Sequence, residues 1–249
     1  MLPHALNGLA FVERFYSFNE IDSTNEYARK LKHCPQKGIY VIQAEKQNAG
    51  RGRRGNSFFS VHEGGLWVSL ITPVKSISEH FIHNRAISIA ICETLRKTDR
   101  TRNVKIKWPN DIYWGDRKIA GILLETVPVS SKALIVGFGL NVNIPLESFP
   151  PILQQSATSL LNETGKRHSP SELLRSILRH YYHCCSADQR NMHGFYCSYL
   201  YKPSKRVTLD DLTGDLEKVE QDGRIVIRTD DGLEKFTSGT LRFLPAPKA

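Results

Sequence analysis

Residues 50–55, Gly-Arg-Gly-Arg-Arg-Gly, carry the strongest chemical signal in the chain, and we call them the arginine loop. Glycines at near-alternating positions let a backbone approach a ligand closely and adopt positive φ angles. Arginine guanidinium groups are planar forks that suit carboxylates and phosphates. The loop is therefore predicted to bind an anionic ligand. A basic surface loop or a nucleic-acid-binding arm would have the same residue types, so the loop alone leaves these alternatives open.

A second group of polar residues occupies residues 107–111, Lys-Trp-Pro-Asn-Asp, and Lys118 follows seven residues later. Asp111 offers the hard oxygen ligand that Mg²⁺ prefers, and Mg²⁺ is usually shared with substrate phosphates. Lys118 is predicted to begin a strand, where its ammonium could reach a negative ligand. Gly121 indicates close packing against a ligand or a neighbouring backbone. A solvated turn with charged residues is the alternative.

A glycine-containing apolar segment, GFGLNVN at residues 137–143, is the third candidate. Glycines inside an apolar strand often mark a bulge or the close approach of another group. We interpret the segment as a strand that lines a pocket. A buried central strand without a ligand would have the same pattern.

Other kinds of chemistry have less support. The histidine pairs at 80/83 and 180/183 have a spacing that could hold a metal, but no third ligand lies near them in the sequence. No Gly-x-Ser-x-Gly motif or Cys/His pairing indicates a protein nucleophile. The arginine loop matches the pattern G-x-G-x-x-G literally, but arginines fill its variable positions and no dinucleotide-binding unit follows.

Strands and helices must position these groups. Residues 22–32 begin with an Asp-Ser-Thr-Asn cluster typical of a helix N-terminus. A helix over 79–96 would place Ile87, Ile91 and Leu95 on one face, and a third is predicted over 171–182. Strands are predicted at residues 40–44, 65–72, 104–107, 112–114, 119–125 and 133–143. The pattern indicates an α+β body.

From residue 205 onward the chain changes character, because short β-prone pieces alternate with turns. Asp-Gly pairs at 222–223 and 231–232 are strong hairpin signals. A small all-β unit is therefore predicted at the C-terminal end, with its boundary near residue 200.

Composition narrows the class of protein. The chain has 249 residues, of which 40% are hydrophobic and 24% charged, a balance typical of globular proteins. The net charge of +9 indicates an anionic partner such as nucleic acid, a nucleotide or an acidic carrier protein. The five cysteines include no C-x-x-C pair, which favours free thiols in a reducing compartment. No segment approaches the roughly 18 apolar residues of a membrane-spanning helix, so a soluble protein is expected.

Taken together, the motifs resemble those of the biotin–protein ligase family. The matching segments are DSTN (22–25), Gln47 with GRGRRG (50–55), KWPND (107–111), DRKIAGILLE (116–125) and GFGLNVN (137–143). They occur in the family's order with near-family spacing. The resemblance covers residues 15–145 firmly and the β-rich tail more loosely. Five ordered motifs are far more specific than any one of them.

The resemblance implies a fold and a reaction. The fold is a mixed β-sheet with flanking helices, similar to class II aminoacyl-tRNA synthetases, plus a small C-terminal SH3-like β-barrel. We expect a catalytic biotin- and ATP-binding domain at residues 1–200 and the barrel at 201–249. The enzyme would join biotin to the α-phosphate of ATP, release pyrophosphate, and transfer biotin from biotinyl-5′-AMP to a lysine of a carrier protein.

The matching positions also imply roles for individual residues. Arg53 and Lys118 would be catalytic, and Asp111 would bind Mg²⁺. Biotin would be bound by Ser23, Thr24, Asn25, Gln47, Gly50, Arg51, Gly52, Arg53, Lys118 and Gly121. ATP and the adenylate would be bound by Arg51, Arg53, Arg54, Phe58, Lys107, Asn110, Asp111, Lys118 and Asn141.

Two residues after the arginine loop depart from the family's pattern. The family commonly continues with Arg and then Trp, where this chain has Asn56 and Phe58. Asn56 lacks a phosphate-pairing cation, which predicts a less tightly held adenylate. Phe58 keeps an aromatic surface for adenine but lacks the indole donor.

The resemblance further implies partners and a location. We expect ATP and biotin as substrates, Mg²⁺ as cofactor, and a biotin carboxyl carrier domain of a biotin-dependent carboxylase as acceptor. We also expect a cytoplasmic protein without membrane contact, either monomeric or homodimeric. Some family members carry an N-terminal winged helix-turn-helix domain, but only 22 residues precede Ser23, so no sequence-specific DNA binding is expected. A lipoate–protein ligase and a nucleic-acid-binding module are the alternative functions.

Overall fold

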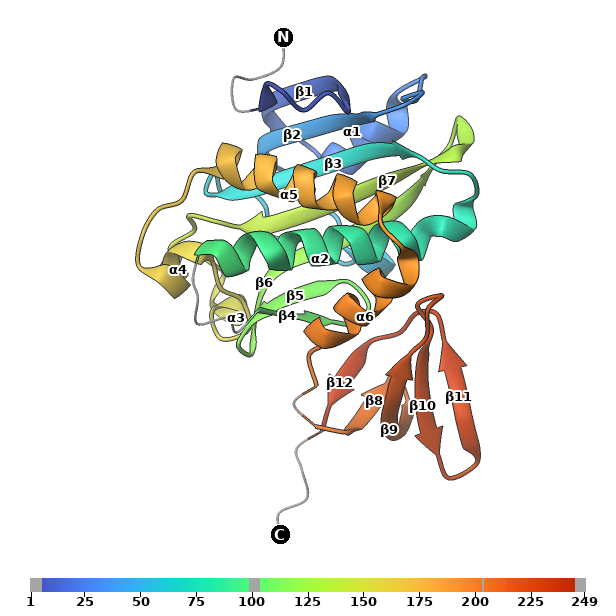
Figure 1. The fold of residues 1–249 in the computed structure, drawn as a ribbon. Helices are drawn as coiled ribbons and strands as arrows, with labels where there is room; N and C mark the ends of the chain where they lie inside the picture. The colour runs from blue at the N-terminus through green and yellow to red at the C-terminus, as the bar shows by residue number, and fades with distance from the viewer. Residues whose placement is uncertain (1–5, 99–103, 203, 245–249) are drawn as a thin grey trace.

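A seven-stranded mixed sheet forms the larger part of the molecule, with strand order β1-β2-β3-β7-β6-β5-β4 (Figure 1). The computed structural model describes residues 6–98, 104–202 and 204–244. The strands are β1 (Val12–Ile21), β2 (Ile39–Gln47), β3 (Gly65–Pro73), β4 (Val104–Lys107), β5 (Asp111–Trp114), β6 (Arg117–Val127) and β7 (Ser130–Asn141). β1 and β2 are parallel, and the other neighbouring pairs are antiparallel. The predicted α+β class is confirmed.

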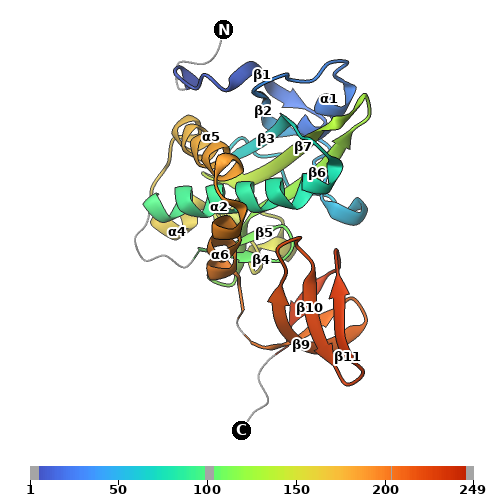
Figure 2. The same ribbon diagram turned by 45° about the vertical axis from the view of Figure 1, so that its right-hand side comes forward.

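Helices cover both faces of this sheet. The α-helices are α1 (Thr24–Lys30), α2 (His80–Thr98), α3 (Pro151–Gln154), α4 (Leu160–Thr164), α5 (Pro170–Ser186) and α6 (Gln189–Tyr199). Figures 1 and 2 show α2 and α5 side by side across one face. Ile87, Ile91 and Leu95 of α2 are buried there, as their spacing predicted. The sheet is therefore shielded from solvent near its centre.

The strand β2 supplies apolar side chains to both faces. Val41 packs in the large core beneath α2 and α5, whereas Tyr40 and Ile42 belong to a smaller core beside α1. Successive strand residues point to opposite faces, so an unbroken apolar strand can serve two cores. This explains why the central strands were recognisable as short apolar segments.

Local signals set where the helices begin. The Ser23 side chain accepts a hydrogen bond from Glu26 N and begins α1, and Ser169 does the same for Glu172 N at the start of α5. The predicted helix over 22–32 is shorter in the structure, because Leu31 is already extended (φ −68°, ψ 130°). The helix α6 follows Asp188, whose side chain caps it.

Several elements were not predicted, among them the edge strand β1 and the helix α6. The strand β1 lies at the edge of the sheet, where half-exposed and polar residues hide the apolar pattern that the central strands show. The helix α6 is amphipathic only in part, and Tyr196 and Tyr199 are its buried residues.

The last part of the chain forms a second, antiparallel sheet, which we call the C-terminal sheet. Its strands are β8 (Arg206–Leu209), β9 (Leu212–Val219), β10 (Ile225–Thr229), β11 (Gly232–Phe236) and β12 (Leu241–Phe243), in the order β11-β10-β9-β8-β12. The turn between β9 and β10 contains the predicted Asp222-Gly223 pair, and Gly223 has a φ of 91°. The predicted β tail is confirmed. The small SH3-like barrel that the resemblance implied corresponds to this five-stranded antiparallel sheet, in which the three-residue β12 pairs with β8 and no closure between β11 and β12 is formed among the described residues.

The C-terminal sheet contacts the body through the turn between β9 and β10. Trp108 Nε1 donates a hydrogen bond to Gly223 O at 3.0 Å. Arg85, almost fully buried on α2, donates from its NH1 to Gln221 O at 3.3 Å. The segment that carries Asn110 and Asp111 is thereby linked to the C-terminal sheet.

Two general features complete the fold. The five cysteines are free, and Cys92 and Cys184 are buried. In the described part of the chain, no helix has both the length and the hydropathy that crossing a bilayer requires.

Candidate ligand-binding site

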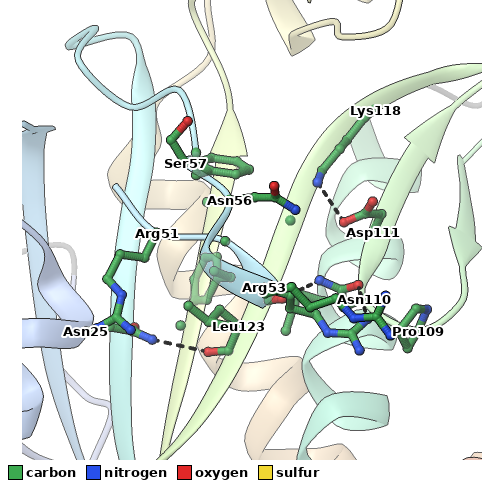
Figure 3. Close-up of a pocket in the computed structure, with 18 of the residues that line it drawn as sticks. Asn25, Arg51, Arg53, Asn56, Ser57, Pro109, Asn110, Asp111, Lys118 and Leu123 are labelled. Carbon is green, nitrogen blue, oxygen red and sulfur yellow. Dashed lines mark hydrogen bonds and ion pairs between the residues drawn. The ribbon is translucent and has the colours of Figure 1, made fainter. Parts of the chain in front are cut away.

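A polar cavity lies where β6 and β7 meet the arginine loop and the segment after β4 (Figure 3). Its volume is about 220 Å³, which is below the roughly 300–1,000 Å³ usual for ligand pockets. Uncharged hydrogen-bonding side chains dominate one end, where Arg51 lies beside Asn25 (Figure 3), and charged side chains line the other. Residues 239–241 of the C-terminal part also line it.

The neutral end is built around Thr24, at the start of α1, and Gln47, at the end of β2. Gln47 Oε1 accepts hydrogen bonds from Thr24 N (2.8 Å) and Thr24 Oγ1 (3.1 Å). Ser69 Oγ, on β3, lies 2.7 Å from Thr24 Oγ1 and 2.5 Å from Asn25 Oδ1. All four side chains are uncharged and buried. This end suits a neutral ligand group that both donates and accepts hydrogen bonds.

Glycines on β6 and β7 give the cavity a flat wall. A Cβ at Gly137 would lie 2.2 Å from Asn25 Oδ1. Cβ atoms at Gly121 and Gly139 would lie 2.8 Å and 2.5 Å from the Phe58 ring. The Phe58 ring therefore packs directly on the glycine backbone, where it fills part of the cavity and contributes to its small volume.

The charged end centres on Lys118 and Asp111. Lys118 Nζ lies 2.7 Å from Asp111 Oδ1 and 5.4 Å from the centre of the Phe58 ring. The pairing of β5 with β6 makes the two residues diagonal neighbours. Asp111 Oδ1 is buried and makes no well-aligned hydrogen bond to a described residue, so the contact is an ion pair held by charge and distance. Such an oxygen can accept another cation.

Two further cations are half-buried beside this pair. Arg53 donates from its NH1 to Asn110 Oδ1 at 3.2 Å, and Figure 3 shows the two side chains together. Burial lowers the pKa of the Arg53 guanidinium, and Arg54 nearby lowers it further. Burial is also the main cause of the lowered pKa of Lys107. Both groups lose hydration in the folded chain, a cost that an anionic ligand would offset.

The other two arginines of the loop contact carboxylates outside the charged end. Arg51 forms an ion pair with Glu26, and its NH2 lies 3.4 Å from Glu125 Oε1. Arg54 forms an ion pair with Asp210 of the C-terminal sheet at 2.8 Å. The three arginines of one short loop thus have three different sets of partners.

Most of the predicted site residues line the cavity together. They are Ser23, Thr24, Asn25, Gln47, Arg51, Gly52, Arg53, Arg54, Phe58, Lys107, Asn110, Asp111, Lys118 and Gly121. Gly50 and Asn141 lie outside this lining. Gly50 packs against Ser60 and the Phe58 backbone, and Asn141 Nδ2 donates to Thr158 O at 2.9 Å. Asn56, one of the two departures from the family's pattern, lines the cavity.

Sequence reasoning missed several residues around the site. Ser69 had a signal, because it is the one polar residue in the segment LWVSLI at residues 66–71. Glu125 ends the DRKIAGILLE motif, but nothing in that motif indicates that it pairs with Arg51. Asp210 and Thr240 had no local signal, since they reach the loop only through folding.

The described residues contain no group of three or more His, Cys, Asp or Glu side chains that could hold a metal by themselves. The buried Oδ1 of Asp111 fits a different arrangement, in which one carboxylate binds Mg²⁺ and phosphate oxygens and water complete its ligands. The residues present are therefore compatible with a magnesium ion that is shared with a nucleotide.

Comparison with known proteins finds a matching family and relatives of similar sequence. Residues 17–143, about half of the chain, match the model of the Biotin/lipoate A/B protein ligase family. The bifunctional ligase/repressor BirA of Escherichia coli is 32% identical over 164 residues, which are 64% of this chain and 49% of that protein. The biotin–[acetyl-CoA-carboxylase] ligase of Paracoccus denitrificans is 29% identical over 157 residues, 61% of this chain and 65% of that protein. The match thus spans about half the length of the E. coli relative.

A solved structure is similar over nearly the whole chain. The biotin protein ligase from Aquifex aeolicus in complex with biotin and ATP has a TM-score of 0.79 and 26% identity, and 92% of this chain and 99% of that chain are covered. The fold and the cavity define an α+β ligand-binding protein whose site is bordered by a loop rich in glycine and arginine. The chain belongs to the biotin/lipoate A/B protein ligase family. The resemblance that the motifs indicated is confirmed.

Proposed function

We propose that this chain is a biotin–protein ligase, which activates biotin with ATP and transfers it to a lysine of a biotin carboxyl carrier domain. The change of polarity along the cavity carries the proposal. Biotin has a neutral cyclic urea at one end and a carboxylate at the other. Thr24 and Gln47 suit the urea, whereas Lys118 and Arg53 suit the carboxylate. The similar Aquifex enzyme was solved with biotin and ATP bound, which supports the same pair of substrates.

In the first step a biotin carboxylate oxygen attacks the α-phosphorus of ATP. A bond forms between the carboxylate oxygen and the α-phosphorus. The bond from the α-phosphorus to the oxygen that bridges the α- and β-phosphates breaks, and pyrophosphate leaves with that oxygen. The step joins two anions, so it depends on cations that are already in place. Lys118 would hold the carboxylate and the developing adenylate, and Arg53 would neutralise the phosphate.

The nucleotide end of the site would need a metal as well. Asp111, next to Asn110 and near Lys107, would hold a magnesium ion through its buried Oδ1. When bound, the ion supplies charge neutralisation to the phosphate oxygens. Lys118, released from Asp111, is then available to the reacting carboxylate.

In the second step the amine of a carrier lysine attacks the carbonyl carbon of biotinyl-5′-AMP. An amide forms, the carbon–oxygen bond to the phosphate breaks, and AMP leaves. The mixed anhydride also reacts with water, so the arginine loop and Phe58 would protect it by covering the cavity. Because Asn56 offers no cation at this position, we expect the adenylate to be held less tightly. Transfer to the carrier lysine would then be slower, and more of the adenylate would leak from the site. The acceptor would be the carrier domain of a biotin-dependent carboxylase.

The proposal is tested by incubating the full chain with biotin, MgATP and a carrier domain, followed by avidin blotting and measurement of pyrophosphate release. We expect biotin-dependent pyrophosphate release and one labelled lysine. Lipoate in place of biotin serves as the matched control, because the family includes lipoate ligases. Pyrophosphate release with lipoate but not with biotin would contradict the proposal and would indicate a lipoate–protein ligase instead.

A division into domains is part of the proposal. We place the boundary at residue 200, between α6 and β8, with the catalytic domain at residues 1–200 and the C-terminal sheet within 201–249. Limited proteolysis should cut first near residues 201–205. Earlier cleavage within α2 or β7 would contradict this boundary.

A further inference from the structure

We infer that Asp210, in the turn between β8 and β9 of the C-terminal sheet, is a positioning residue for the arginine loop and acts through Arg54. In this arrangement, two ion pairs latch the loop across the cavity, and one of them reaches a residue 156 positions away in the sequence. The kinetic consequence of the latch rests on the proposed function. The contact itself does not.

The contact between Arg54 and Asp210 is a two-point fork. Arg54 NH1 donates to Asp210 Oδ1 at 2.8 Å, and NH2 donates to Oδ2 at 2.9 Å. Paired parallel hydrogen bonds of this kind fix the orientation of both groups as well as their distance. A single flexible surface contact would not orient the loop in this way.

The C-terminal sheet holds the carboxylate ready for this contact. Thr240 N donates to Asp210 Oδ1 at 3.0 Å, and Asp210 N donates to Thr240 O at 3.2 Å. Arg54 NH1 also donates to Thr240 Oγ1 at 3.4 Å. The carboxylate is therefore positioned by its own sheet, independently of the loop.

The backbone is unusual at both ends of the contact. Among the residues that the structure describes, the non-glycine residues with positive φ are Arg54 (55°) and Asp210 (49°). Aspartate tolerates this left-handed region, but arginine rarely adopts it. The two outliers are partners in one ion pair, so the loop takes up a costly conformation where a contact outside the loop can compensate.

The opposite side of the loop has its own anchor. Arg51 pairs with Glu26 of α1 and Glu125 of β6. Arg53 lies between the two anchors in the chain and contacts Asn110 inside the cavity. Arg51 and Arg54 thus hold the loop, and Arg53 is left facing the ligand position.

The latch is weak enough to open. The side chains of Arg54 and Asp210 are 50% and 41% exposed, and exposed ion pairs contribute little to stability. Substrates and products must pass the loop, so a contact that forms and breaks readily is suited to it. Its loss should change the population of the closed loop without unfolding the protein.

Trypsin reports loop opening directly, because it cleaves after arginine and the loop contains three. In Asp210→Asn the charge is lost while the backbone preference stays, since Asn also tolerates positive φ. We expect cleavage within residues 50–55, mapped by mass spectrometry, to be about two- to fivefold faster than in the wild type. Asp215→Asn is the matched control, since Asp215 pairs with Lys205 and Arg206 within the C-terminal part. Trypsin should cleave the loop of Asp215→Asn at the wild-type rate.

Two more variants separate the latch from the shape of the turn. Asp210→Gly relieves the positive φ but removes the carboxylate, and we expect faster cleavage, as in Asp210→Asn. Asp210→Glu keeps the charge and should restore most of the protection. Cleavage of Asp210→Asn and Asp210→Gly at the rate of Asp215→Asn would overturn the inference.

Steady-state kinetics tests the positioning role. For Asp210→Asn we expect the KM for ATP to rise about two- to fivefold with a smaller change in kcat, because the charged end of the cavity is intact. An unchanged KM would overturn the positioning role. Absence of biotin transfer by the wild type would instead contradict the proposed function, and the trypsin result would still stand.

Discussion

Lys118 Nζ and Asp111 Oδ1 lie 2.7 Å apart at the charged end of the cavity, on the neighbouring strands β6 and β5. A register shift between Ile112 and Tyr113 lies next to this pair. Each charge compensates the other in the structure. A ligand carboxylate and a magnesium ion that arrive together would give both residues new partners, so the pair can open without leaving an unpaired charge.

Removal of the cation from this pair should slow the first chemical step. In Lys118→Ala we expect the rate of biotin-dependent pyrophosphate release to fall about 100-fold, the scale seen when one preorganised charge or donor is lost. Single-turnover measurements separate the rate of this chemical step from the effect of the substitution on substrate binding. Lys132→Ala, which removes an exposed lysine at the start of β7, should keep the wild-type rate. An unchanged rate in Lys118→Ala would contradict the role given to Lys118.

Removal of the carboxylate should change the response to magnesium. In Asp111→Asn the concentration of Mg²⁺ that gives half-maximal activity should rise about tenfold, because an amide oxygen is a weaker ligand than a carboxylate. A magnesium titration at saturating ATP measures this. Asp116→Asn is the control, since Asp116 lies in the nearby exposed turn and accepts a hydrogen bond from Tyr201. Equal magnesium curves for the two variants would argue against Asp111 as a ligand.

The glycine wall gives a steric prediction. In Gly137→Ala the new Cβ would lie 2.2 Å from Asn25 Oδ1, so the neutral end must rearrange. We expect biotin binding to weaken by about 1–3 kcal/mol, measured by calorimetry. Gly194→Ala has open space around its Cβ and lies within α6, so it should bind biotin normally and be slightly more stable. Equal biotin affinity in both variants would exclude a role for the close approach at Gly137.

A buried histidine gives a prediction about stability and pH. Burial lowers the pKa of His83 from 6.5 to about 4, and its Nδ1 lies 2.7 Å from Tyr181 Oη. Between these two values the unfolded chain binds a proton that the folded chain does not. The free energy of unfolding should therefore fall as the pH falls, by about 2 kcal/mol from this group between about pH 7 and pH 5.

Urea unfolding at the two pH values tests the effect of His83. The His83→Gln variant should lose less stability on acidification than the wild type. His33→Gln, which removes an exposed histidine, should keep the wild-type difference. The same loss in all three proteins would mean that other groups cause the acid sensitivity.

The sequence predicted the elements whose signal is local. The apolar segments at β3 and β7 and the periodic residues of α2 could be read without knowledge of the fold, because burial on both faces, or on one helical face, leaves a pattern in the sequence itself. The edge strand β1 could not, since an edge position tolerates polar residues. The small SH3-like barrel expected for the tail came from the family resemblance, and the strand order of the antiparallel sheet found there was decided by pairing between strands distant in the sequence, such as β8 with β12.

The cavity also combines features that the local sequence predicted with features that only folding decided. The residue types of the arginine loop and of residues 107–111 were enough to predict a site for anionic ligands, and the structure brings most of those residues together. Asn141 belonged to a matching motif, but its amide binds Thr158 O outside the cavity lining. A motif indicates which residues are close in sequence, but it cannot show which group each side chain meets.

By itself, the sequence determined the α+β class, the family and the chemistry of the arginine loop. Only the tertiary structure decided how the three arginines divide, with Arg51 on Glu26 and Glu125, Arg53 on Asn110, and Arg54 on Asp210. The physical reason is that residue type sets what a side chain can bind. Its partner is set by backbone direction and by chain segments that come together only when the protein folds.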